Sequence, residues 1–160
     1  DQNIIFYLKN INFINNTFLY DDPSSTFGVS YAKQFNSKNR NAINLFCAKI
    51  ANGGNTDVLA FYTPDGDYLV TGIERGQLND GYVLGHEIGH FLSLNHTFYG
   101  WEATTYSCNV PTPKSIFYNN QNIPVEYVDR AKLLNGTQVC KLAADGFCDT
   151  PADYNLGFAM

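Results

Sequence analysis

Apolar residues in the first half of the chain gather in short runs that alternate with polar, turn-forming stretches. Runs rich in β-branched and aromatic residues predict β-strands, and they occupy residues 3–9, 43–50, 57–63 and 67–73. Asparagine, glycine and proline at residues 52–55 and 64–66 predict turns between these strands. The short second turn indicates that the last two strands form a hairpin. Residues 22–40 are mostly polar and predict only a short helix, around residues 31–34.

The spacing of apolar residues changes to that of a helix beyond residue 80. Apolar side chains recur there at helical intervals, at Val83, Leu84, Ile88, Phe91 and Leu92. We therefore expect a helix over about residues 80–93. After residue 96 the periodicity fades into loop-like stretches, with one further helix predicted over residues 125–134. This order of elements predicts a single domain of the α/β (α+β) class with an irregular C-terminal part.

All three histidines of the chain lie in the run from His86 to His96. His86 and His90 belong to an H-E-x-x-H sequence, and residues four apart lie on one face of a helix. Two imidazoles placed in this way can hold one zinc ion at about 2.0–2.1 Å, and His96 completes the three-ligand pattern of catalytic zinc. The fourth position is left for water, and Glu87 is then the candidate general base. The alternative is a buried histidine pair that binds no metal.

Composition and charge narrow the class of protein. With 160 residues, the chain is long enough for one domain with a substantial core. Its 44% of hydrophobic residues excludes a disordered chain. A net charge of −5 argues against a nucleic-acid-binding protein. No apolar run approaches the roughly 18 residues of a membrane-spanning helix, and no signal peptide is visible. We expect the chain to be a processed or excised piece of a longer precursor.

The four cysteines favour disulfide chemistry over metal binding. None of them forms a C-x-x-C pair, so a structural zinc–cysteine site is not expected. The loop-rich C-terminal third contains Cys108, Cys140 and Cys148. Disulfides add most stability to a segment of this kind, and they form in an oxidising compartment. Cys108–Cys140 is the preferred pair because both residues flank one loop excursion, although spacing alone does not settle connectivity. Cys47 follows an apolar run and is expected to be a buried free thiol.

Two segments carry a resemblance to a known family. Residues 83–98 combine H-E-x-G-H with a later histidine, threonine and phenylalanine, and residues 145–151 have the sequence D-G-x-x-D-T-P. Both resemble the pappalysin (cytophagalysin-like) metzincins. The resemblance implies a zincin fold with a twisted mixed sheet, a zinc-binding active-site helix and an irregular, disulfide-tied C-terminal subdomain. An upper subdomain would span residues 1–96, and residues 97–160 would begin the lower one.

The same resemblance implies roles for individual residues. His86, His90 and His96 are the expected zinc ligands, and Glu87 is the expected general base. The strand just before the helix is expected to be the sheet edge along which a peptide substrate lies, by strand addition. Asp145, Asp149 and Asp153 invite a calcium hypothesis, because carboxylates are preferred calcium ligands. The alternative for these aspartates is an ordinary role in turns and caps.

Two positions depart from the family pattern. Metzincins usually have glycine where Ser93 stands, because the chain turns sharply toward the third ligand. A non-glycine residue adopts the left-handed backbone there at a cost of about 1–2 kcal/mol. Metzincins also have a methionine turn, and the only methionine here is Met160. We expect the chain to end before that turn and to lack an N-terminal strand and helix. The alternative is that Met160 forms the turn in a compact variant.

The function expected from these features is a secreted, bacterial zinc endopeptidase that hydrolyses peptide bonds through a zinc-bound water activated by Glu87. A chain without the methionine turn is expected to bind zinc yet cleave peptides poorly. The alternative is a non-catalytic or truncation-inactivated metal-binding module of a larger secreted protein. A zinc enzyme with a non-peptide substrate is a third, less supported reading.

Overall fold

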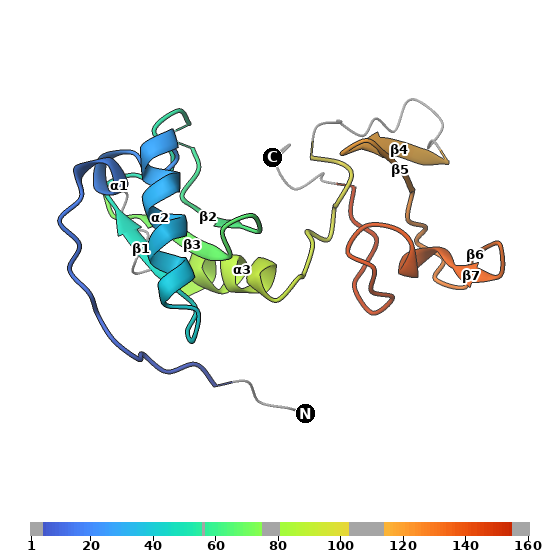
Figure 1. The fold of residues 1–160 in the computed structure, drawn as a ribbon. Helices are drawn as coiled ribbons and strands as arrows, with labels where there is room; N and C mark the ends of the chain where they lie inside the picture. Colours follow the sequence, from blue (N-terminus) through green and yellow to red (C-terminus); the bar gives the residue numbers. More distant parts are fainter. Residues whose placement is uncertain (1–4, 56, 75–80, 103–113, 155–160) are drawn as a thin grey trace. The chain divides into compact units, whose positions relative to one another are not determined.

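The computed structural model describes residues 5–55, 57–74, 81–102 and 114–154. The chain divides into two compact units, unit 1 (residues 1–93) and unit 2 (residues 94–160). Figure 1 shows both units. The architecture is mixed α/β with small sheets, as expected. None of the helices in the described part of the chain is long and apolar enough to cross a membrane.

Unit 1 is built on a three-stranded sheet with the order β1-β3-β2. Strand β1 (Leu45–Ala48) runs parallel to β3 (Tyr68–Gly72), and β2 (Ala60–Thr63) pairs antiparallel with β3. These strands confirm the predictions for residues 43–50, 57–63 and 67–73, together with the predicted hairpin. The local pattern was sufficient because each strand is short and bounded by turn residues.

The position of β3 at the centre of the sheet corrects one expectation. Every residue of β3 is buried, because helices cover both of its faces. The strand just before the helix was expected to be the sheet edge, and this prediction is wrong. The edge strand beside the helix is β2. Order along the chain did not reveal this, because β3 pairs backward with β2 and also in parallel with β1.

Helices α1 (Thr17–Asp21) and α2 (Thr26–Lys38) pack on one side of the sheet, against β1 and β3 (Figure 1). The core on this side contains Phe46, whose ring meets that of Tyr68 edge to face at 5.3 Å. Ser25 begins α2, because its side chain accepts a hydrogen bond from the Gly28 N–H. The helix is therefore much longer than the predicted one around residues 31–34, whose polar surroundings hid the capping signal.

The predicted strand at residues 3–9 is wrong for the residues that the structure describes. Residues 5–9 have no regular secondary structure and pair with none of the described strands. Ile5, Tyr7 and Leu8 are between 77% and 83% exposed. Apolar β-forming residues do not make a strand without a partner strand. Residues 1–4 lie outside the described part of the chain.

Helix α3 (Gly81–Phe91) lies where the sequence predicts it and packs against β2 and β3. Its last turn closes through hydrogen bonds from Leu92 N–H to Ile88 O at 3.0 Å and from Ser93 N–H to His90 O at 2.9 Å. Ser93 then takes a left-handed backbone with φ of 70°. This confirms the conformation expected for Ser93, which turns the chain away from the helix axis.

Unit 2 contains two small β-hairpins. Strands β4 (Ser115–Tyr118) and β5 (Gln121–Pro124) form one, and β6 (Leu133–Leu134) and β7 (Thr137–Gln138) form the other. Both turn residues have positive φ in each, at Asn119, Asn120, Asn135 and Gly136. Such turns match the twist of the flanking strands. The helix predicted over residues 125–134 is therefore wrong, because the Asn-Gly turn draws its last two residues into a strand.

The disulfide of unit 2 joins Cys140 to Cys148, whose Cα atoms are 5.1 Å apart. The preferred pairing of Cys140 with Cys108 is therefore wrong, and Cys108 lies outside the described residues. The chain between Cys140 and Cys148 folds back at Gly146, where φ is 81°. Asp145 supports this turn by accepting a hydrogen bond from the Phe147 N–H. Sequence spacing does not show a reversal of this kind.

Cys47 is a free cysteine, as expected, but it is exposed rather than buried. Burial alternates along β1, so that Phe46 and Ala48 enter the core and Cys47 lies on the other face. The prediction of a buried thiol is wrong because the apolar run around it belongs to a strand with only one buried face.

Unit 2 is stabilised by a small core and a buried ion pair. Trp101, Ile116 and Val125 form the core. The Glu126 side chain is only 2% exposed and is paired with Arg130 four residues later. Burial raises the pKa of Glu126, although the Arg130 guanidinium opposes this. One carboxylate oxygen of Glu126 and one Arg130 nitrogen have no hydrogen-bond partner among the described residues. The Arg130 guanidinium is therefore the main group that stabilises the buried Glu126 charge, and the Asp153 backbone N–H adds a smaller contribution.

We predict that Arg130→Met destabilises unit 2 by about 3–5 kcal/mol at pH 7, because it leaves a buried carboxylate unpaired. The pKa of Glu126 in the folded state is raised, so protonation favours the folded state, and the loss should shrink as pH falls through that pKa. Trp101 is the only tryptophan and lies in unit 2, so its fluorescence during urea unfolding reports on this unit. Replacing both partners, Glu126→Leu with Arg130→Met, should recover much of the loss. A loss in the single variant that is equal at pH 7 and pH 4 would contradict the account.

We also predict that Ser93→Gly stabilises unit 1 by up to about 1 kcal/mol. Glycine adopts the left-handed backbone without the cost of about 1–2 kcal/mol that serine bears. Part of this gain is offset, because glycine loses more chain entropy on folding than serine does. All described α-helices belong to unit 1, so circular dichroism at 222 nm during thermal unfolding is the measurement. Ser30→Gly, inside α2, is the matched control and should destabilise. Equal effects of the two substitutions would show that Ser93 is not strained.

Candidate metal centre

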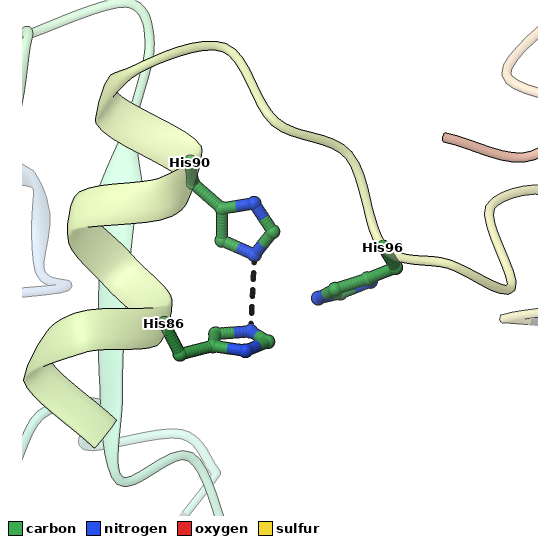
Figure 2. A group of neighbouring side chains, drawn as sticks. All are labelled: His86, His90 and His96. Carbon is green, nitrogen blue, oxygen red and sulfur yellow. Dashed lines mark hydrogen bonds between the residues drawn. The ribbon is translucent and has the colours of Figure 1, made fainter. Parts of the chain in front are cut away.

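His86 and His90 project from the same side of α3 (Figure 2). Their Nε2 atoms are 3.1 Å apart. Two nitrogen ligands of one tetrahedral ion, each at about 2.05 Å, are about 3.3 Å apart. The spacing of the two imidazoles therefore fits a shared metal ion. The same distance also allows a hydrogen bond between them when one ring donates its N–H.

His96 completes the group, as Figure 2 shows. One ring nitrogen from each of the three histidines lies within 4.8 Å of the others, and no other group of three or more potential metal ligands was found in the described residues. The structure thus brings together all three residues that the sequence singles out. A set of three imidazoles suits zinc, copper, iron and nickel, so this group could hold a metal ion.

The ring of His96 has neighbours that orient it. It stacks on Phe98, with ring centroids 4.7 Å apart and an interplanar angle of 23°. Its Nδ1 atom lies 3.5 Å from the Glu102 carboxylate, whose other oxygen accepts a hydrogen bond from the Gly100 N–H at 2.7 Å. Carboxylates behind metal-binding histidines commonly fix the ring orientation. Sequence reasoning missed Glu102, and its only signal was an acidic residue shortly after the third histidine.

Glu87 follows the first histidine but occupies a different environment. It is only 8% exposed. Burial raises the pKa of Glu87, while His86, His90 and a hydrogen bond from the Tyr62 backbone N–H oppose the shift. Tyr62 belongs to β2, so the carboxylate is attached to the edge strand. The Tyr62 side chain packs edge to face on Phe91, which holds the strand against the helix. Its hydroxyl donates a hydrogen bond to Asp67, in the turn between β2 and β3.

Among the described strands, β2 has a partner on one side only, which leaves its other edge free beside α3. Gly72 N–H donates to Leu59 O at 3.0 Å, which makes that pair a bonded one. In an antiparallel ladder the intervening pairs point their backbone groups away from the partner strand. The backbone groups of Ala60 and Tyr62 therefore face outward, and the Tyr62 N–H meets Glu87 there. A strand edge thus borders the helix that carries two of the three histidines.

The three aspartates proposed for calcium do not come together as a group of ligands in the described structure. Asp145 accepts hydrogen bonds from the Phe147 N–H and from the Thr150 hydroxyl, which is the turn role considered for it. Asp153 accepts one from the Thr97 hydroxyl at 2.7 Å. The Asp145 carboxylate therefore has the local role that aspartates play in turns, whereas that of Asp153 joins two segments far apart in the sequence.

Comparisons of the chain with protein-family models, with curated proteins and with solved structures give no match. The features of the chain that bear on its function are the histidine group, the buried Glu87 and the free edge of β2.

Proposed function

We propose that the protein is a zinc-dependent endopeptidase of the pappalysin type. The observation that carries the proposal is the gathering of His86, His90 and His96, two of which act electrostatically on the neighbouring Glu87. Three imidazoles with a neighbouring carboxylate are the donor set of catalytic zinc with its general base. The resemblance of residues 83–98 and 145–151 to that family supports it. The Cys140–Cys148 disulfide agrees with secretion, since disulfides persist in oxidising compartments.

The three histidines and Glu87 have different roles in the proposed peptide hydrolysis. The three histidines would hold the zinc ion. When bound, zinc supplies a Lewis acid that polarises a carbonyl and makes water more acidic. The Glu87 carboxylate takes a proton from the attacking water and delivers it to the amide nitrogen, so that a C–O bond forms as the C–N bond breaks. Its partial burial and the Tyr62 N–H keep this carboxylate in one position.

An extended peptide is the substrate that the neighbouring strand fits. The outward backbone groups of β2 that remain available are those of Ala60 and the carbonyl of Tyr62. An added strand forms hydrogen bonds with such an edge. Because β2 packs against α3, a peptide on this edge passes close to Glu87.

A metal-binding module without catalysis is the second candidate. The observation that favours it is the burial of Glu87 together with its hydrogen bond from Tyr62, since a purely structural carboxylate shows the same features. The two candidate functions differ in whether a bound peptide is hydrolysed. Peptide hydrolysis by the zinc-loaded wild type and by Glu87→Gln therefore distinguishes them.

We predict that the purified protein binds one equivalent of zinc and that His90→Ala loses most of it. Removing one of three ligands sharply weakens a site whose affinity depends on all of them. Zinc content after dialysis is the measurement. Leu84→Ala is the matched control, because Leu84 lies on the same helix but is not a ligand. Equal zinc content in His90→Ala and the wild type would show that the histidines do not form the site.

We predict that Glu87→Gln keeps the zinc and the fold but lowers peptide hydrolysis by about 10²–10⁴-fold, the usual contribution of general acid–base catalysis. Glutamine has the same shape and can still accept the Tyr62 N–H, but it does not take up the proton. Hydrolysis of a mixed library of unstructured peptides, followed by mass spectrometry, is the measurement. Hydrolysis by the variant at the wild-type rate would exclude Glu87 as the base. A zinc-loaded wild type that cleaves none of the peptides would favour the binding module.

A further inference from the structure

An open pocket of about 350 Å³ lies along β2 on the side away from α3. Val29 of α2 and Phe61 of β2 form apolar walls, Ser24 and Asn52 add a hydroxyl and an amide, and the end of β2 completes the lining with Tyr62, Thr63 and Pro64. Phe61 also packs against the core beneath α1 and α2. The pocket therefore lies on the opposite face of the sheet from the histidines, within unit 1.

Strand geometry decides which side chains of a bound peptide can reach this pocket. Successive residues of a strand point to opposite faces of the sheet, and residues directly opposite each other share a face. A peptide residue opposite Tyr62 shares the face of Tyr62, which packs on Phe91 of α3. A peptide residue opposite Phe61 lies instead on the face of Phe61 and enters the pocket. The two positions are neighbours in the peptide.

The chemistry of the pocket favours an uncharged, bulky side chain. None of its lining residues carries a charge. Immediately behind Ser24, the Asp22 carboxylate accepts hydrogen bonds from the Ser24 hydroxyl and the Gly53 N–H. The hydrogen bond from the Ser24 hydroxyl makes the largest contribution to lowering the pKa of Asp22, and that from the Gly53 N–H adds to it. The Asp22 carboxylate therefore stays anionic. A negatively charged side chain in the pocket would meet this carboxylate at short range, which is unfavourable.

We propose that the pocket formed by Val29, Phe61, Ser24 and Asn52 is a substrate subsite that selects a bulky apolar or aromatic side chain at the peptide position opposite Phe61. The inference rests on the proposed function, since it places a substrate peptide on the β2 edge. The subsite would determine specificity separately from the metal centre. Val29 forms one apolar wall of the pocket, so the size of its side chain should control how large a substrate side chain fits.

The test uses hexapeptides in which tryptophan, leucine, alanine or aspartate is placed at each position in turn. Binding is measured by fluorescence anisotropy with zinc-free protein, where hydrolysis is not expected, and cleavage is measured with zinc-loaded protein. The wild type should prefer tryptophan or leucine over aspartate at the pocket position. Val29→Trp fills the pocket and should reduce that preference by roughly tenfold, the scale of apolar pocket discrimination. Val29→Ala deepens the pocket and should favour tryptophan over leucine. Ser30→Trp adds the same bulk at the next, exposed position of α2 and should leave the preference unchanged.

The outcomes separate the subsite from the proposed function. A loss of preference at one position in Val29→Trp, and not in Ser30→Trp, supports the subsite. Peptides that are bound and cleaved with the same preference in the wild type, Val29→Trp and Val29→Ala would refute the subsite and leave the peptidase intact. If the wild type neither binds nor cleaves any peptide, the proposed function fails and the subsite fails with it.

Discussion

Helix α3 packs against β2 and β3, and Glu87 is on its buried side, where the Tyr62 backbone N–H helps to lower the carboxyl pKa that burial raises. The Glu87 carboxylate therefore faces the edge of β2. Successive residues of a helix are rotated by about 100°, so burying Glu87 turns the neighbouring His86, and with it His90, away from the sheet. His86 and His90 lie together because they are four residues apart on one helix, and the rotation of that helix decides the direction in which both imidazoles point.

As a result, the short strand β2 contributes side chains to both faces of the sheet in unit 1. Tyr62 packs on Phe91 of α3, whereas its neighbour Phe61 packs into the core beneath α2. The outward backbone groups of β2 lie between these two faces. A site of this kind needs little additional structure, because a single edge strand orients the candidate base, borders the histidines and lines the pocket beside Val29.

The elements that depend on local sequence pattern could be predicted from the sequence. The predictions were wrong where contacts between distant residues determine the structure. Helix α3 and strands β1, β2 and β3 follow from periodicity, and the histidine spacing alone pointed to the group that the structure brings together. The exposed segment at residues 5–9 has strand-like residues but no described partner strand, and the placement of β3 between β1 and β2 was invisible to chain order. In unit 2 the Asn135-Gly136 turn was a local signal that was overlooked. The pairing of Cys140 with Cys148 depends on a reversal near Gly146 that spacing does not encode.

The proposed function depends on whether the three histidines bind a zinc ion. X-ray absorption spectroscopy of the zinc-loaded protein measures the ligand shell directly. We predict three imidazole nitrogens at about 2.0–2.1 Å with one further light atom, the shell of a catalytic zinc site. A shell with fewer than two imidazoles, or with sulfur at about 2.3 Å, would contradict the assignment of His86, His90 and His96 as the metal centre.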